Sequence, residues 1–458
     1  MNTEQFDSFF INDGLPITQA IKRYHNRRLA FLKHCHVFTV LTGVTEPLSQ
    51  HNHWLNIDTA IYQEPNMLYL TGLNQPNVAL IANPTDNTIT LFLATHDETK
   101  IFWEGPVLGF QRSTAAELAS FLHVDAVLDY DQLFDYVYQY LNTQKNPVYS
   151  LFWHSKNTTT PQQADCYDRF KQDIMLFLTN KGISQQPFNC EEFMQYRLCL
   201  DKVDQHNLSC ANQLTATVFK QCLGQLHQFE SETQVAGFIK GAITTHSWFG
   251  ESFPPIVAAG KNAAILHYRF HHSMLTKNSL LLLDFGCKHF TMPADISRTV
   301  PINGRFNPLQ ALLYSIVLAA QSVVEKAAKA GVTIKQLNDL CWKFVETELE
   351  NTFFKQGGQA QRPYKTQPHN VSHLIAHTVH DGDRYRKYRT TPLTTGMVIS
   401  NEPGLYGQFS MTIDGVEYNE HIGIRIEDNL LITDKGCDNL SKDCPKTIAD
   451  IEALFTNK

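Results

Sequence analysis

LLLDFGCKHFTMPADISRT, residues 281–299, begins with a run of leucines that ends abruptly on Asp284. A second carboxylate, Asp295, lies inside another β-rich run that continues with Ile296. A carboxylate at the end of an apolar strand is costly to bury unless a positive charge pairs with it. Two such carboxylates in one hairpin repel each other, and a cation between them would relieve the repulsion. The alternative explanation is a pair of turn aspartates that cap the strands.

A histidine cluster follows in PHNVSHLIAHTVHD, with His369, His373, His377 and His380. Spacings of four place three of them on one helix face, as in a zinc-binding helix, but the glutamate expected beside the first histidine is missing. The interleaved β-branched residues are equally typical of a strand or an irregular segment, in which the first three histidines again share a face. A metal role and ordinary structural histidines both explain the cluster.

Two glutamates also interrupt apolar segments. MVISNEPGLY is a strand-like run that ends on Glu402 and turns at once through Pro-Gly. HIGIRIEDNLLIT is an apolar strand with Arg425 and Glu427 on one face. Asp428 alternates to the opposite face, so Glu427 is the better candidate for an inward ligand. A turn carboxylate and a cross-strand ion pair are the alternatives that need no metal.

Together these segments place four carboxylates and a histidine cluster in one half of the chain. Such an oxygen-rich set suits two divalent ions held by bridging carboxylates about 3.5–4 Å apart. Carboxylate-heavy ligands favour Mn²⁺ or Co²⁺ over a thiolate-type zinc site, although Zn²⁺ stays open.

Composition narrows the class of protein. The 458 residues, 43% of them hydrophobic, are enough for two domains. The net charge of -7 and the lack of basic runs argue against a nucleic-acid or anionic-membrane surface. The N-terminal residues lack the basic region and following apolar stretch of a secretory signal, so no such signal is expected. No apolar segment of membrane-spanning length is expected either. Ten scattered cysteines without a C-x-x-C pair suit a reducing, cytoplasmic location.

The order of patterns predicts two domains, an α/β domain at 1–185 and an α+β domain at 186–458 whose helices pack outside an antiparallel sheet. Turn-forming polar segments between 155 and 190 place the boundary. Helices are predicted at 15–34, 191–223, 308–331 and 333–351, and another after the N-cap Ser231. Strands are predicted at 68–73, 78–83 and 88–94. The H-C-H at 34–36 and the H-N-H at 51–53 lack further ligands, so ordinary polar roles are expected for them.

The ordered set of motifs resembles the metal-dependent Xaa-Pro aminopeptidases (aminopeptidase P), with the related prolidases and methionine aminopeptidases. The similarity covers nearly the whole chain. In the second half it is carried by AAILHY, LDFG, ADISRTVPINGRF, PHNVSH, HTVHD, NEPGLY, GIRIED and GCDNLSKDCPKTIADIEAL. In the first half it is carried by YQEPNMLYLTGLNQPNVALI and IFWEGPVLG. It implies an aminopeptidase P-like N-terminal domain and a catalytic domain with the pita-bread (creatinase/aminopeptidase-like) fold.

The resemblance also implies roles for individual residues. The dimetal centre would be held by Asp284, Asp295, His373, Glu402 and Glu427. Of these, Asp295 and Glu427 would bridge the ions, and Glu402 would act as general base. His267 and His380 would steady the substrate carbonyl and the developing oxyanion, and His369 would shape the proline pocket. Arg425 would orient Glu427 or the substrate end.

The chain departs from the family pattern around the histidine cluster, at Asn370, Ala376, His377 and Thr378. No expected ligand is lost, but the pocket wall and the substrate preference are less certain. LDFG also matches the Asp-Phe-Gly of protein kinases, yet the glycine-rich loop, the V-A-I-K strand and the H-R-D loop of kinases are all missing. The kinase interpretation is therefore discarded.

The expected reaction is hydrolysis of the bond between an N-terminal residue and a following proline in a peptide. One alternative is a prolidase, which accepts only Xaa-Pro dipeptides. An alternative of another class is a non-enzymatic pita-bread protein that binds partners, although such a protein is expected to have lost ligands. The resemblance further implies assembly as a homodimer or homotetramer.

Overall fold

The computed structural model describes residues 10–44, 63–104, 106–110, 113–152, 166–188, 191–382 and 386–456. It divides the chain into two compact units, Met1–Arg197 and Leu198–Lys458. This division lies later in the chain than the boundary predicted after residue 185. The H-N-H segment at 51–53 is outside the described residues.

The first unit is built on a six-stranded mixed sheet with the order β4-β3-β2-β1-β5-β6. Its strands are β1 (Phe38–Thr42), β2 (Val78–Asn83), β3 (Thr88–Leu93), β4 (Ala126–Asp129), β5 (Val148–Phe152) and β6 (Ser184–Gln185). Its helices are α1 (Ile17–His34), α2 (Pro65–Thr71), α3 (Glu98–Glu104), α4 (Ala115–Leu122), α5 (Leu133–Asn142) and α6 (Cys166–Asn180). Antiparallel pairs join β1, β2 and β3, whereas β4, β5 and β6 pair in parallel. The predicted α/β class of this unit is confirmed.

One strand predicted in this unit is instead the helix α2. The Glu64 carboxylate accepts a hydrogen bond from the Met67 N–H at 2.7 Å, which caps the first turn. Pro65 at the first helical position has a fixed φ that suits a helix, and Gly72 ends the helix at φ 70°. The prediction of a strand at 68–73 was wrong because a short apolar run does not distinguish the two structures, and the caps decide.

A buried arginine ties two of these helices together. Arg28, which is 1% exposed, donates to the Leu70 carbonyl at 2.8 Å and to the Leu122 carbonyl. These oxygens lie in the last turns of α2 and α4, where carbonyl groups have no partner within the helix and a cation is favoured. Burial lowers the pKa of Arg28 to about 9. The guanidinium therefore acts as a shared C-terminal cap.

The second unit contains α8 (Lys202–Gln225), α9 (Glu232–His246), α10 (Pro308–Ala327), α11 (Ile334–Thr352) and α12 (Ile448–Thr456). The single helix predicted at 191–223 is divided into α7 (Glu191–Leu198) and α8. The break arises because Asp201 leaves the helix to accept hydrogen bonds from the N–H groups of Val203 and Asp204 at 2.9 and 3.0 Å. Ser231 caps α9 as predicted.

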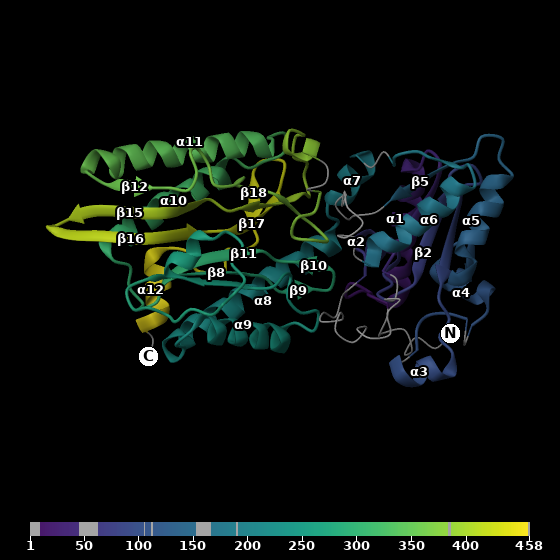
Figure 1. Ribbon diagram of the computed structural model, residues 1–458, viewed down its shortest axis with the longest axis horizontal. Coiled ribbons are helices and arrows are strands. Elements are labelled where there is room, and N and C mark those ends of the chain that lie inside the picture. The colour runs from purple at the N-terminus through teal and green to yellow at the C-terminus, as the bar shows by residue number, and fades with distance from the viewer. Residues whose placement is uncertain are drawn as a thin grey trace. The chain divides into compact units, whose positions relative to one another are not determined.

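Described strand pairs in the second unit are all antiparallel. The strands are β7 (Ile256–Ala259), β8 (Leu280–Phe285), β9 (Lys288–His289), β10 (Met292–Pro293), β11 (Ile296–Pro301), β12 (Gln359–Gln361), β13 (Leu374–Ile375), β14 (Val398–Asn401), β15 (Gly404–Ile413), β16 (Val416–Arg425), β17 (Asp428–Ile432) and β18 (Cys437–Asn439). They form sheets ordered β10-β9, β11-β8-β7, β12-β15-β16 and β13-β14-β17-β18. Helices α10 and α11 pack against each other near the β15–β16 hairpin, and α8 and α9 lie on the other side of the unit (Figure 1). This is the predicted α+β pita-bread domain.

The opening motif folds as two paired strands with a short β9–β10 hairpin between them. β8 pairs with β11, and Ser297 lies opposite Asp284. Gly286 is required here, because a Cβ atom at this position would lie 1.8 Å from the Ala294 carbonyl oxygen. The glycine thus lets the backbone before Asp295 approach the end of β8 closely. This close approach brings the two aspartates of the motif into one site.

Among the described residues, one helix, α10, is long and apolar enough to cross a membrane by length and composition alone. The expectation that no segment reaches that length was wrong for this helix. Half of its most apolar window is buried inside the unit, and it packs on α11, β15 and β16. These contacts are those of a core helix.

Asp428, the first residue of β17, is the centre of a buried ionic network. Its carboxylate accepts hydrogen bonds from Arg298 Nη2 at 2.6 Å and from Lys446 Nζ at 2.6 Å. Arg298 also donates to the Glu427 carbonyl oxygen at 2.6 Å. Burial alone would raise the pKa of Asp428, but the two cations lower it to about 2. The prediction that Asp428 faces away from Glu427 is explained by this network.

We predict that Asp428→Asn lowers the free energy of unfolding by about 3–5 kcal/mol, because the substitution leaves Arg298 buried without its anion. Urea denaturation followed by circular dichroism measures the change. Asp438→Asn is the matched control, since Asp438 is an exposed aspartate on the adjacent strand β18. Equal stability of the two variants would contradict the assignment of Asp428 as the centre of the network.

Candidate metal centre

The strands deliver five polar side chains to one place in the second unit. Asp284 is in β8, Asp295 directly precedes β11, His373 directly precedes β13, Glu402 follows β14, and Glu427 lies between β16 and β17. Backbone hydrogen bonds hold both glutamates: Glu402 N–H donates to Val371 O and Glu427 N–H donates to Ser297 O, at 2.9 and 3.0 Å. These are the five residues predicted as metal ligands.

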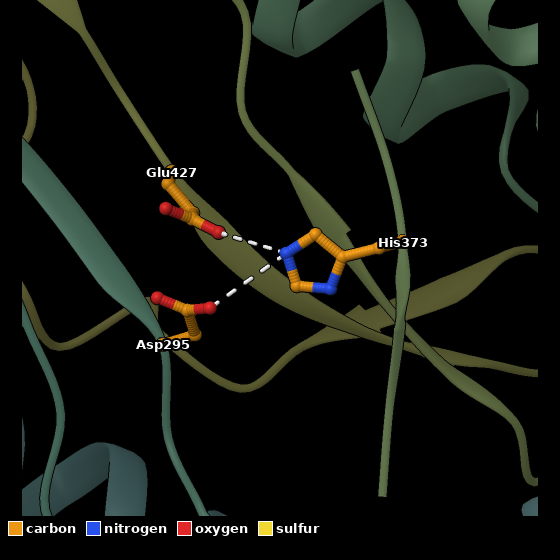
Figure 2. A group of neighbouring side chains, drawn as sticks. All are labelled: Asp295, His373 and Glu427. Carbon is orange, nitrogen blue, oxygen red and sulfur yellow. Dashed lines mark ion pairs between the residues drawn. The ribbon is translucent and has the colours of Figure 1, made fainter. Parts of the chain in front are cut away.

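His373 lies at the middle of the cluster. Its Nε2 atom is 3.3 Å from Glu402 Oε1, 3.7 Å from Asp295 Oδ2 and 3.8 Å from Glu427 Oε1. Figure 2 shows His373, Asp295 and Glu427 pointing toward a common point. The ligand atoms of these three residues all lie within 4.8 Å of one another, and no other such His/Cys/Asp/Glu group occurs in the described parts of the chain. The ligand atoms of these three side chains are thus close enough together to hold one ion jointly.

The carboxylates of this cluster destabilise one another. Burial raises the pKa of Asp295 well above its ordinary value, and the charges of Asp284 and Glu402 raise it further. Burial also raises the pKa of Glu427, and the Asp295 charge adds to this shift. Such a concentration of negative charge is tolerated in an interior when cations neutralise it.

Unsatisfied oxygen atoms provide the test of whether metal ions fit. Asp284 Oδ1 and Glu427 Oε1 are buried and receive no hydrogen bond from the described residues. Buried carboxylate oxygens are normally paired or coordinate a metal. Four carboxylates and one imidazole also form the ligand set expected for Mn²⁺, Co²⁺ or Zn²⁺. The residues present therefore fit divalent ions.

Arg425 is the buried cation beside the cluster. It donates from Nη2 to Asp284 Oδ2 at 2.6 Å and from Nε to Ser297 Oγ at 2.8 Å. Ser297 Oγ in turn donates to Glu427 Oε2 at 2.8 Å. Burial lowers the pKa of Arg425, but Tyr406 and the neighbouring carboxylates raise it well above its ordinary value. Arg425 thus reaches Asp284 directly and Glu427 through a serine.

Glu402 faces both the cluster and the cavity in front of it. Its Oε1 atom accepts a hydrogen bond from Ser400 Oγ at 3.2 Å, and Oε2 lies 3.8 Å from His369 Nδ1. Burial raises the pKa of Glu402 to about 7, against the lowering effect of Arg425. This carboxylate is therefore the member of the cluster placed for proton transfer.

Two other histidines of the sequence cluster reach the site. The rings of His373 and His380 stack with their centroids 3.9 Å apart. His369 Nε2 lies 3.1 Å from the hydroxyl oxygen of Tyr406, and burial lowers the pKa of His369 to about 4. His369 is therefore neutral near pH 7 and positioned by Tyr406.

His377 points elsewhere. Its Nε2 atom is 4.0 Å from Asp204 Oδ2 on α8, and its N–H donates to Asp381 Oδ2 at 3.0 Å. The segment contains only the two-residue strand β13 and turns, not a helix. The open choice between helix and irregular segment is thus decided, and His377 does not share the face of His373.

His267 is carried on a loop that a buried glutamate anchors. Glu232, at the start of α9, accepts hydrogen bonds from Asn262 Nδ2 at 2.9 Å and from the Tyr268 hydroxyl at 2.9 Å. It also accepts from the Ser273 N–H at 3.0 Å. These bonds fix the loop on both sides of His267.

A cavity of about 410 Å³ opens in front of the cluster. Nine predicted site residues line it: Asp284, Asp295, His373, Glu402, Glu427, His267, His369, His380 and Arg425. Its apolar wall contains Phe253, Ile256, Leu266 and Val379, and two further cations, Arg269 and Arg389, also line it. One cavity therefore joins the carboxylate cluster to an apolar surface.

Sequence reasoning did not single out three residues of this arrangement. Ser297 connects Arg425 to Glu427, and Tyr406 contacts His369. Asn429 holds the backbone of Asp295, which donates to Asn429 Oδ1 at 3.0 Å. Each lies one or two residues from a predicted site residue or inside a quoted motif, which is the signal that could have identified them.

Comparison with known proteins gives the family. Residues 206–434 match the model of metallopeptidase family M24, and residues 24–149 match the aminopeptidase P N-terminal domain. The chain belongs to metallopeptidase family M24. All five predicted ligand positions and the cavity fall within the M24 part, so the chain is a metallopeptidase with an aminopeptidase P-type N-terminal domain.

Relatives within this M24 group resemble the chain over most of its length. It is 29% identical to the Xaa-Pro aminopeptidase of Haemophilus influenzae, covering 86% of this chain and 88% of the relative. It is 26% identical to intermediate cleaving peptidase 55 of Saccharomyces cerevisiae, covering 86% of this chain and 76% of the relative. Among solved structures, proline aminopeptidase P II from Yersinia pestis matches with a TM-score of 0.77 and 26% identity, covering 96% of this chain and 100% of that one.

Proposed function

We propose that this metallopeptidase is an Xaa-Pro aminopeptidase that holds two divalent ions, with Mn²⁺ as the first choice. The observation that carries the proposal is that the four carboxylates, four histidines and an apolar wall all line one cavity. Peptides with proline in second place are supported as the substrate class because the Haemophilus influenzae relative is an Xaa-Pro aminopeptidase. The ions would be held by Asp284, Asp295, His373, Glu402 and Glu427.

When bound, the ions lower the pKa of a water molecule and polarise the scissile carbonyl. Glu402 accepts the proton of the attacking water and delivers it to the leaving proline nitrogen. His380, stacked on His373, and His267, on the Glu232-anchored loop, donate hydrogen bonds to the carbonyl oxygen as its negative charge develops.

Substrate selection follows from the two halves of the cavity. The apolar wall and the neutral His369 suit a proline ring, and a proline nitrogen has no N–H group that a protease could bind. The free α-amino group of the substrate is attracted to the carboxylate cluster, which limits cleavage to the chain end. Arg269 and Arg389 line the cavity, where their positive charges would attract a carboxylate or carbonyl group further along the substrate.

We expect the protein loaded with Mn²⁺ to release the first residue from an Xaa-Pro-Yaa tripeptide. Replacing the proline by alanine should lower kcat/KM at least about tenfold, because the apolar pocket loses its ring contacts. Liquid chromatography of the released amino acid measures both rates. Matched assays with Co²⁺ and Zn²⁺ identify the preferred ion.

The same assay separates the alternatives. Cleavage of Xaa-Pro dipeptides but not of tripeptides would support a prolidase in place of an aminopeptidase. If no proline peptide of any length is cleaved with any of the three ions, the aminopeptidase proposal is lost.

We also propose that the protein works in a reducing, cytoplasmic compartment as a homodimer or homotetramer. The eight cysteines whose side chains are described are all free thiols, which supports the compartment. Sedimentation analysis of the purified protein tests the assembly.

A further inference from the structure

Gln321 lies on α10 behind the metal centre and is fully buried. Its Nε2 atom is 3.3 Å from the Asn401 carbonyl oxygen and 3.2 Å from the Ile426 carbonyl oxygen. These two carbonyls belong to the residues that directly precede Glu402 and Glu427. One side-chain amide therefore holds the backbone in front of two separate ligands.

The orientation of this amide is fixed by further contacts. Lys446 Nζ donates to Gln321 Oε1 at 2.9 Å, so the Nε2 group must face the two carbonyls. Asn401 Nδ2 also donates to the backbone carbonyl of Gln321 at 2.9 Å, which ties α10 to the end of β14. Both polar atoms of the Gln321 side chain are thus used.

The position of these bonds matters because the chain changes sheets at both glutamates. β14 and β17 pair up to Asn401 opposite Asp428, and β15 and β16 pair from Gly404 opposite Arg425. Glu402 and Glu427 lie in the crossing between these two ladders, outside the regular pairs. At the crossing, Ile426 N–H donates to Pro403 O at 3.3 Å, and Gln321 Nε2 donates to a carbonyl group on each of the two crossing segments.

We propose that Gln321 is a positioning residue of the metal centre, which holds Glu402 and Glu427 at the separation needed to ligate cations jointly. The inference rests on the proposed dimetal function. Residues that orient metal ligands typically contribute about 10- to 100-fold in metal affinity. Gln321 has this effect through the backbone, without touching the ions.

A matched control is available on the same helix. Gln310 is also buried, and its Nε2 donates to Asn278 O at 2.9 Å and to Glu420 Oε2 at 2.7 Å, none of which lines the cavity. Substitution of either glutamine by methionine removes a buried amide from α10, and at Gln310 this amide also accepts a hydrogen bond from the Asn307 N–H in the capping box of the first turn. Only Gln321→Met removes an amide that bonds the backbone next to two proposed metal ligands.

The test is calorimetric titration of metal-free protein with MnCl₂, together with thermal unfolding in EDTA. We expect Gln321→Met to bind Mn²⁺ about 10- to 100-fold more weakly than wild type. Gln310→Met should keep the wild-type affinity, although both variants unfold at lower temperature in EDTA. If Gln321→Met does not fold, Gln321→Glu serves, since it keeps the contact with Lys446 and loses the donor.

Wild-type Mn²⁺ affinity in Gln321→Met, or an equal loss of affinity in Gln310→Met, would overturn the proposal, because both results mean that the amide acts only on general stability. Failure of the wild-type protein itself to bind Mn²⁺, Co²⁺ or Zn²⁺ would instead overturn the dimetal function, and the inference with it.

Discussion

Glu402→Gln is expected to lower the kcat of Xaa-Pro peptide hydrolysis by about 10²- to 10⁴-fold, the usual contribution of a positioned general base. Glutamine has nearly the same shape and keeps an oxygen for Ser400 and for an ion, but it cannot accept and return a proton. The fold should persist, because Glu402 is held through its backbone N–H by the Val371 carbonyl. Steady-state kinetics on a tripeptide measures the loss.

Metal analysis of the same variant separates the proton-transfer role from the ligand role. If Glu402→Gln keeps the metal content of wild type and loses turnover, the residue acts as the base. Glu417→Gln, at an exposed glutamate on the β15–β16 hairpin, is the control and should retain full activity. Near-wild-type turnover in Glu402→Gln would remove the proposed base.

The grouping of these acidic side chains in one site was predictable because carboxylates at the ends of apolar strands conflict with burial. Asp284 ends a leucine run, and Glu427 interrupts an isoleucine-rich strand. Such positions need a compensating charge wherever the strands lie in space. The structure places both side chains in the same cavity, together with His373. Local pattern therefore indicated which carboxylates need a compensating charge, whereas the choice of His373 among the four clustered histidines came from the family resemblance.

The sequence pattern of a segment did not predict its secondary structure correctly where capping residues at the segment ends decide whether a helix forms or breaks. The 68–73 segment is apolar enough for a strand, yet Glu64 and Gly72 cap it as a helix. The amphipathic pattern at 191–223 is continuous in the sequence, but Asp201 caps a new helix and breaks it. Caps act through one or two hydrogen bonds, which periodicity does not register.

Contacts between residues far apart in the chain could also not be predicted from the sequence. Arg425 reaches Ser297, and Gln321 reaches Asn401, only because separate sheets and α10 meet at the crossing. Each of these residues is ordinary in its own segment, since a polar side chain on a strand or helix is more often solvated. The sequence shows which groups need partners, and the fold determines which partners they obtain.

Asp295→Asn is expected to reverse the usual effect of a core substitution, by stabilising the metal-free protein while abolishing its response to metal. Burial and the neighbouring carboxylates raise the pKa of Asp295, so the folded state disfavours the ionised form. The metal-free protein therefore loses stability as the pH rises above the ordinary carboxyl pKa, and at pH 7 this penalty is present. A neutral asparagine removes it.

In wild type, Mn²⁺ at 100 times its Kd should raise the free energy of unfolding by about 2.7 kcal/mol for each ion bound. Asp295→Asn should lose this gain and all turnover, because one of the proposed metal ligands is gone. Calorimetric melting with EDTA and with MnCl₂ measures both effects at pH 7. Asp428→Asn is the contrasting variant: Asp428 is also buried but paired with Arg298 and Lys446, so its loss should lower the melting temperature in both conditions. If Asp295→Asn instead destabilised the metal-free protein as strongly as Asp428→Asn does, the carboxylate would be held by ordinary ion pairs, and the argument for cations at this cluster would fail.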